Sequence, residues 1–156
     1  MTDPALPQGP NNAAAHSGSR LSAAQRQALH AAASAAMLRA YAPYSRFQVG
    51  AAVLDGQGRI HAGCNVENAA YPQGVCAEAG ALSAMVLAGG TEVLAVLVVG
   101  SGDALVTPCG GCRQKIREFA APQVPVLIAD PVQVRAAFTL EHLLPHSFGP
   151  EHLEPR

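Results

Sequence analysis

The chain has 156 residues, of which 49% are hydrophobic, and a formal net charge of −1. This length suits one domain with a sizeable core, and the near-neutral charge argues against long nucleic acid as a partner. No apolar run reaches the roughly 18 residues that a membrane helix needs, so we expect no membrane span.

Residues 1–20 are polar, carry three prolines and lack the basic start and apolar stretch of a secretory signal. We therefore expect a flexible N-terminal tail over residues 1–20 and a single domain over residues 21–156. Nothing in the chain suggests secretion, and closely spaced thiols in a reducing compartment more often bind metal than pair as disulfides. These features predict a cytoplasmic protein.

Apolar periodicity and turn residues predict the secondary structure in chain order. The expected elements are a helix over 21–40 with Ser22 as N-cap, strands over 47–54 and 59–65 joined by a turn at 55–58, a helix over 76–87 ended by Gly89-Gly90, a strand over 92–99, a short helix over 111–119, strands over 124–129 and 132–139, and a helical turn over 140–144. This order predicts an α/β fold of two or three layers with a partly parallel sheet.

Three cysteines carry the strongest chemical signal, in Cys76-Ala77-Glu78 and in Pro108-Cys109-Gly110-Gly111-Cys112. Each motif places a cysteine at or just before the start of a predicted helix, where free N–H groups and a partial positive charge favour thiolate. The spacing of Cys109 and Cys112 lets one helical turn present both sulfurs to one ion. Three thiolates can hold zinc, and we expect one zinc ion per chain.

A structural zinc site would close with a fourth protein ligand, and no histidine or cysteine has a suitable spacing to Cys76. The open fourth position favours a catalytic site with zinc-bound water. Glu78 could move the protons of that water, although a glutamate in a first helical turn is also favoured by the helix dipole alone. Arg113 could donate a hydrogen bond to a ligand sulfur, or it could be a solvated helix residue.

These residues match the signature of zinc deaminases, and the chain resembles the small cytidine deaminases that act on free nucleosides. The resemblance runs from about Leu21 to Leu153 and rests on four segments besides the cysteine motifs. They are Tyr41-Ala42-Pro43-Tyr44-Ser45-x-Phe47-x-Val49-Gly50-Ala51-Ala52, Gly63-Cys64-Asn65-Val66-Glu67-Asn68-Ala69, Tyr71, and Leu143-Leu144-Pro145-x-x-Phe148-Gly149-Pro150. It implies a three-layer α/β/α sandwich with a mixed five-stranded sheet.

The resemblance also implies a mechanism, in which zinc-activated water attacks C4 of cytidine or 2′-deoxycytidine and ammonia leaves. Glu78 would shuttle the protons, and the backbone N–H of Ala77 would hold the pyrimidine O2. Cys76, Cys109 and Cys112 would be the ligands. The product would be uridine or 2′-deoxyuridine, as in pyrimidine salvage.

The remaining substrate contacts are likewise implied by the resemblance. Asn65 and Glu67 would bind the ribose 3′-hydroxyl as donor and acceptor, and Phe47 would pack near the base and sugar. Phe148, Ala69 and Tyr71 would act across a subunit interface, which implies a homotetramer with shared active sites. Without the family, Asn65 and Glu67 read equally well as an ordinary polar loop, and Phe47 as core.

Two alternatives stay open, namely a related deaminase of a cytosine-containing antibiotic and a non-catalytic, zinc-stabilised interaction domain. Editing of cytosine within nucleic acid is disfavoured because basic residues and base-stacking aromatics are few. The chain departs from the family pattern at Ala79, where many small members carry an arginine that offsets the charge of the thiolates.

Overall fold

The structure is a computed structural model that describes residues 21–153. Its elements in chain order are α1 (Ala23–Met37), β1 (Val49–Asp55), β2 (Ile60–Cys64), the 3-10 helix η1 (Tyr71–Gln73), α2 (Ala77–Leu87), β3 (Val93–Gly100), α3 (Gly110–Arg117), β4 (Pro125–Ala129), β5 (Val134–Thr139), α4 (Leu140–Leu143) and the 3-10 helix η2 (Pro150–His152).

The five strands form one mixed sheet in the order β2-β1-β3-β4-β5. Strand β1 pairs antiparallel with both β2 and β3, and β4 pairs antiparallel with β5. Only β3 and β4 run parallel, and their connection passes through α3. This confirms the mixed five-stranded sheet.

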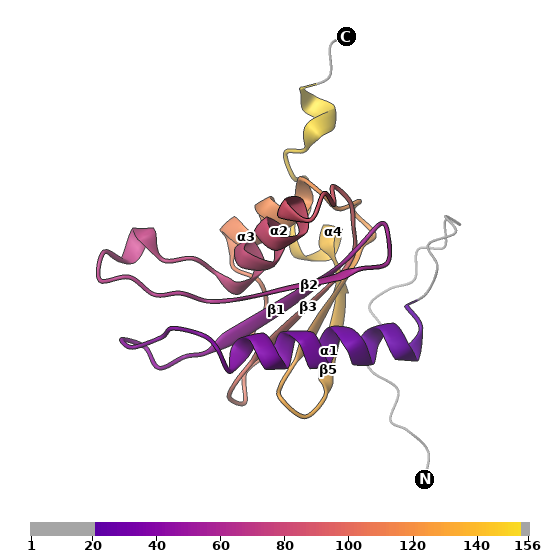
Figure 1. The fold of residues 1–156 in the computed structure, drawn as a ribbon. Helices are drawn as coiled ribbons and strands as arrows, with labels where there is room; N and C mark the ends of the chain where they lie inside the picture. Colours follow the sequence, from indigo (N-terminus) through magenta and orange to yellow (C-terminus); the bar gives the residue numbers. More distant parts are fainter. Residues whose placement is uncertain (1–20, 154–156) are drawn as a thin grey trace.

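Alternating side chains of the central strands feed two separate cores, which makes the fold a three-layer sandwich. On one face, Leu29, Ala33 and Met37 of α1 pack against the sheet. On the other face, the sheet packs against buried residues of α2 and α3, including Met85 and Ile116. Figure 1 shows α1 crossing one face while α2 and α3 lie together on the opposite side.

A glycine sets the closeness of α2 to the sheet. A Cβ at Gly63 in β2 would lie 2.3 Å from the amide nitrogen of Ala81 and 2.6 Å from the carbonyl oxygen of Ala77. Any larger residue would push α2 outward. The first turn of α2, which bears Cys76 at its N-cap, is thereby seated directly on the strand that leads to Asn65.

The predicted elements are all present, with boundaries that differ by at most three residues. Helix α1 has the expected Ser22 cap, which forms a reciprocal capping box with Gln25. It ends at Met37 rather than at residue 40, and Leu38 beyond it is 72% exposed. Residues 21–153 contain no helix long and apolar enough to cross a membrane, and the tail expected over residues 1–20 lies outside the described part of the chain.

Candidate functional site

The three predicted ligand cysteines converge where the N-termini of α2 and α3 meet. Cys76 and Cys109 occupy the N-cap positions of the two helices, and Cys112 lies one turn into α3. Their sulfur atoms all lie within 4.8 Å of one another, and those of Cys76 and Cys109 are 3.9 Å apart. Two sulfurs at the usual Zn–S distance in a tetrahedral site would be separated by about 3.8 Å. The cluster therefore fits one zinc ion.

No further histidine, cysteine or carboxylate of residues 21–153 joins this group of three sulfurs. A three-ligand set leaves one position of a tetrahedral zinc for a non-protein ligand, which is the pattern of catalytic sites. Cys64 lies half-buried at the end of β2 and is not in the cluster.

Glu78 is buried, at 5% exposure, in the first turn of α2. The thiol of Cys112 donates to its Oε2 over 3.4 Å. A carboxylate in this position touches the metal cluster without belonging to it. It is also favoured by the positive end of the helix dipole.

The pKa values of the three thiols are shifted in different directions by this shared site. Burial and the Glu78 carboxylate raise the pKa of Cys112 well above its usual range, and burial raises the pKa of Cys76 as well. At Cys109 burial acts in the same direction, but hydrogen bonding from Cys112 outweighs it and the pKa is lowered. Binding of zinc must therefore release protons from the cluster.

A cavity of about 190 Å³ opens onto the cluster. Its walls are Val49, Asn65, Cys76, Ala77, Glu78, Val106, Thr107 and Cys109. Ala77 is the first residue of α2, so its N–H has no partner within the helix and can donate to a ligand. The cavity thus combines two metal ligands, a buried carboxylate and a fixed backbone donor.

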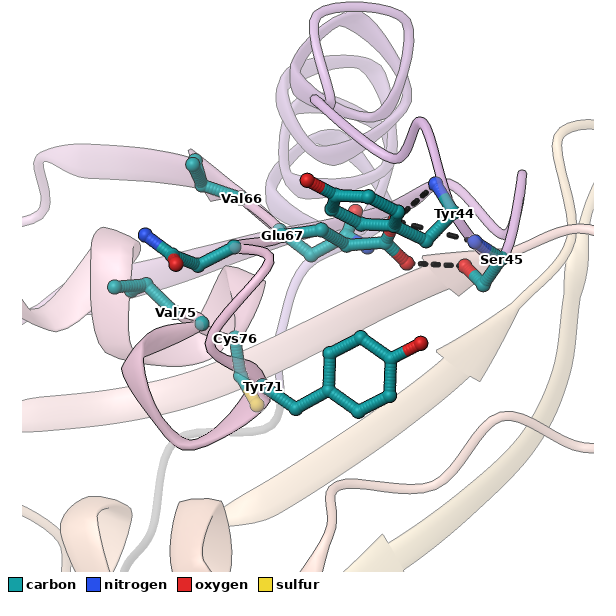
Figure 2. A pocket seen from close by; sticks show the side chains of 10 residues that line it. Tyr44, Ser45, Val66, Glu67, Tyr71, Val75 and Cys76 are labelled. Carbon is teal, nitrogen blue, oxygen red and sulfur yellow. Dashed lines mark hydrogen bonds between the residues drawn. The ribbon is translucent and has the colours of Figure 1, made fainter.

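A larger cavity of about 460 Å³ adjoins the smaller one, because Asn65 and Cys76 line both. Its other walls are Tyr44, Ser45, Val66, Glu67, Asn68, Tyr71, Gly74 and Val75. Figure 2 shows the sulfur of Cys76 at one end of the larger cavity. The rings of Tyr44 and Tyr71 lie on either side of the cavity. The two ring centroids are 6.2 Å apart.

Glu67 holds the turn that forms one wall of the larger cavity. Its Oε2 accepts from the backbone N–H of Tyr44 at 2.8 Å and of Ser45 at 3.2 Å, and its Oε1 accepts from the Ser45 hydroxyl. The Ser45 hydroxyl bond is the largest cause of a lowered pKa at Glu67. The carboxylate is therefore ionised and fixed in the wall (Figure 2).

Asn65 clamps the strand that follows this turn. Its Oδ1 accepts from the N–H of Val49 at 2.8 Å, and its Nδ2 donates to the carbonyl of Phe47 at 2.9 Å. The amide therefore holds the backbone of segment 47–49 while one edge of the residue lines both cavities. One hydrogen of Nδ2 remains for a ligand.

Arg113 contacts oxygens rather than sulfurs. Its Nε and Nη1 donate to the carbonyls of Pro108 and Leu143, each at 2.7 Å, and its Nη2 donates to Thr107 Oγ1 at 3.2 Å. The sequence left open a hydrogen bond from Arg113 to a ligand sulfur, and in the structure its bonds go instead to the loop that precedes Cys109 and to the last residue of α4. The guanidinium fixes that loop, and Thr107 of the same loop lines the smaller cavity.

Of the four other predicted contact residues, one lines a cavity and three do not. Tyr71 is 78% exposed and lines the larger cavity. Phe47, Ala69 and Phe148 are outside the linings of both cavities, and Phe148 is 57% exposed with its ring stacked on His152.

Sequence reasoning assigned no role to Ser45, Val106 or Thr107, although all three line the cavities. Ser45 stood within a recognised motif, but only its contact with Glu67, 22 positions away, reveals its use. Val106 and Thr107 lie in a loop with no pattern of its own.

Comparison with known proteins gives a consistent result. A family model described as the cytidine and deoxycytidylate deaminase zinc-binding region matches residues 23–128. The cytidine deaminase of Mycobacterium tuberculosis is 43% identical over 114 residues, which cover 73% of this chain and 82% of that protein. The cytidine deaminase of Sporosarcina psychrophila is 42% identical over 115 residues, which cover 74% of this chain and 85% of that protein.

Solved structures agree with the sequence comparisons. The crystal structure of cytidine deaminase from Burkholderia pseudomallei has a TM-score of 0.73 and 42% identity, and the match covers 78% of this chain and 98% of that one. The crystal structure of cytidine deaminase from Mycobacterium tuberculosis has a TM-score of 0.67 and 41% identity, with 80% and 97% covered.

Proposed function

Because this chain belongs to the cytidine deaminase family, we propose that it hydrolyses cytidine and 2′-deoxycytidine to the uracil nucleosides with release of ammonia. One observation carries the proposal. The buried carboxylate of Glu78 contacts Cys112 within a cluster of three sulfurs, and a cavity opens onto both. This combination supplies a metal site, a proton carrier and room for a ring.

The chain's own residues divide the chemistry between them. Cys76, Cys109 and Cys112 would hold zinc, which when bound supplies Lewis acidity and makes hydroxide available near neutral pH. Glu78 takes a proton from the attacking water and delivers it to N3 of the cytosine ring. It then takes the proton of the hydroxyl formed at C4 and delivers that proton to the departing amine. The bond from the water oxygen to C4 forms, the C4–N4 bond breaks, and ammonia leaves.

The smaller cavity suits the pyrimidine ring. The N–H of Ala77 donates to O2 from a fixed peptide, so little reorganisation is needed when the base enters. Val49 and Val106 supply apolar walls that exclude bulk water from the reacting carbon. The larger cavity then receives the sugar, since it shares Asn65 and Cys76 with the smaller one.

Asn65 and Glu67 would bind the 3′-hydroxyl of that sugar. The remaining Nδ2 hydrogen of Asn65 is the donor, and the carboxylate of Glu67 is the acceptor. A lowered pKa keeps Glu67 ionised at neutral pH. A fixed negative charge in this wall also disfavours a phosphate on the sugar, which supports a free nucleoside as substrate.

The complete site would belong to a homotetramer. Several aromatic side chains are exposed in the single chain, among them Tyr41, Tyr44, Phe47, Tyr71 and Phe148. Exposed aromatics of this kind mark interfaces. In the tetramer Phe148, Ala69 and Tyr71 would complete a neighbouring subunit's site. The four free cysteines favour a reducing compartment, so the enzyme would act in cytoplasmic pyrimidine salvage.

A nucleoside panel tests the proposal. Purified protein is assayed for zinc content and for ammonia released from cytidine, deoxycytidine, adenosine and a cytosine-containing antibiotic. We expect about one zinc per chain and rapid turnover of the first two compounds. Zinc without any ammonia would favour a zinc-stabilised interaction domain, and turnover of the antibiotic alone would favour the related deaminase.

A further inference from the structure

The segment that follows α4 contacts α3 and ends in the 3-10 helix η2, which projects from the fold. Figure 1 shows it in yellow beyond the layer of α2 and α3. We call residues 144–153 the C-terminal arm. The arm carries Phe148, which is 57% exposed.

Two side chains of α3 hold the arm by polar contacts. Arg117 donates from Nε to Ser147 Oγ at 3.1 Å and forms an ion pair with Glu151. Gln114 donates from Nε2 to the carbonyl oxygen of Phe148 at 2.9 Å. The Arg117 side chain is 11% exposed, whereas its partner Glu151 is 52% exposed, so the arginine lies under the arm and the ion pair faces solvent on one side.

The backbone of the arm lies directly on the Arg117 guanidinium. A Cβ at Gly149 would lie 2.5 Å from Arg117 Nη2 and 2.7 Å from its Cζ. On the other side of Gly149, its N–H donates to His152 Nδ1 at 3.0 Å, and the His152 ring stacks on Phe148 with centroids 4.9 Å apart. The backbone around Phe148 is thus held by Arg117 and Gln114, while the exposed ring itself stacks on His152.

The polar contacts of the arm offset part of the cost of ordering it, but the Phe148 ring adds little in the single chain. Fixing each residue of the arm loses conformational entropy, whereas an exposed ring buries little apolar surface in return. The contacts are understandable when Phe148 is held ready for a surface outside its own subunit. Helix α3 also supplies Cys109 and Cys112, so the arm and the metal cluster are built on one element.

We propose that Arg117, assisted by Gln114, is a positioning residue that fixes the C-terminal arm so that Phe148 enters the nucleoside cavity of a second copy of the chain. This inference rests on the proposed function. An arm without Arg117 would have to be ordered each time substrate binds, so the loss appears in KM. The metal cluster and Glu78 are untouched, so kcat is retained.

A double-mutant cycle tests the inference. Arg117→Ala and Gln114→Ala are measured alone and combined with Phe148→Ala. Arg135→Ala on β5 serves as the matched control because its polar contacts go to Gly102, Asp103 and Asp130, away from the arm. We expect Arg117→Ala to raise KM for cytidine about fivefold or more with kcat within about twofold, and Arg135→Ala to change neither. Zinc content should stay the same in all variants.

The cycle separates positioning from general destabilisation. In the Phe148→Ala background, Arg117→Ala should add no further increase in KM, because the group that it positions is gone. An equal increase in both backgrounds, or no increase in either, overturns the inference. If Arg117→Ala does not fold, Gln114→Ala at the exposed edge of the same contact takes its place with the same criterion.

Failure of the proposed function gives a different result. A wild-type protein that forms oligomers but releases no ammonia refutes the deaminase proposal alone. The positioning role of Arg117 is then tested by the stability of the oligomer. In that case Arg117→Ala and Phe148→Ala should shift the subunit equilibrium toward smaller species to the same extent in light scattering. A wild-type monomer at assay concentrations overturns the inference whatever its activity.

Discussion

The buried aspartate at the far end of the β1–β2 hairpin provides the sharpest test of the fold energetics. Asp55 is fully buried, and its Oδ1 accepts from the N–H of Gln57 at 2.9 Å and of Arg59 at 2.8 Å. Its Oδ2 accepts from Arg59 Nε and from His61 Nε2, both at 2.8 Å. Arg59 in turn donates to the carbonyl of Ala88 at the end of α2. One carboxylate therefore joins the hairpin to the helix that bears Glu78.

The substitution Asp55→Asn keeps the size of the side chain but reverses half of these contacts. The Oδ1 bonds survive, whereas the new Nδ2 faces two donors, on Arg59 and His61. Each hydrogen bond to a charged group contributes roughly 1.5–3 kcal/mol. Because the Arg59 side chain is 40% exposed, its share is at the low end. We expect a loss of about 3 kcal/mol, which lowers Tm by roughly 10 °C for a domain of this size.

The pH dependence follows from the direction of the pKa shift. Burial opposes ionisation of Asp55, but the bonds from His61, Arg59 and Gln57 outweigh it and lower the pKa far below the usual value. The stabilisation is therefore complete above the unfolded pKa of about 4 and is lost progressively as the pH falls toward the folded value. The difference in Tm between wild type and Asp55→Asn should be smaller at pH 3 than at pH 7.

Thermal unfolding followed by circular dichroism measures both effects, with Asp103→Asn in an exposed loop as the matched control. The control should melt with the wild type at both pH values. If Asp55→Asn melts within about 2 °C of the wild type at pH 7, the hydrogen bonds of the Asp55 carboxylate do not stabilise the fold as we expect.

Three further predictions concern the site. Glu78→Gln should keep zinc and fold but lower kcat by at least about a hundredfold, because the amide cannot carry the proton; a variant with normal kcat would refute the shuttle role. Removal of zinc by a chelator should lower Tm and abolish turnover, and added zinc should restore both, since a metal that binds only the folded state stabilises it by mass action; an unchanged Tm would mean that the three sulfurs do not hold the metal. Ser45→Ala should raise KM for cytidine by about two- to tenfold with kcat retained, because Glu67 and the amide of Phe47 both lose the Ser45 hydroxyl; a change in kcat alone would contradict this role.

Local sequence signals were sufficient for the elements and for the metal cluster. The alternation of Val96 to Val99 gives β3 its two buried faces, and Gly89 with φ of 82° ends α2 as expected from its position. Cys76 and Cys109 lie at helix N-caps because each motif stands at the boundary between a loop and a helix. Each of these features depends on residues that are close together in the chain, so a local sequence pattern is enough to predict it.

Side-chain partners across the fold could not be predicted in the same way. From its place after Cys112, Arg113 could have contacted a sulfur or solvent, but α4 brings the carbonyl of Leu143 within reach, 30 positions away in sequence. Asn65 and Glu67 were predicted to point at a ligand, whereas most of their hydrogen-bonding capacity holds the backbone of residues 44–49. Such choices are decided by which backbone groups the tertiary fold leaves without partners.

The negative charge of the cysteine cluster is offset mainly by the N-termini of α2 and α3. With Arg113 bonded to oxygens and an uncharged side chain at Ala79, the positive ends of α2 and α3 are the fixed positive charges at the sulfurs, about half a unit each. Three thiolates and Glu78 exceed that supply, which is why burial and mutual repulsion keep the pKa of Cys76 and Cys112 high before metal enters. The charge of the zinc must itself complete the balance, so uptake of zinc should release protons and strengthen steeply as the pH rises.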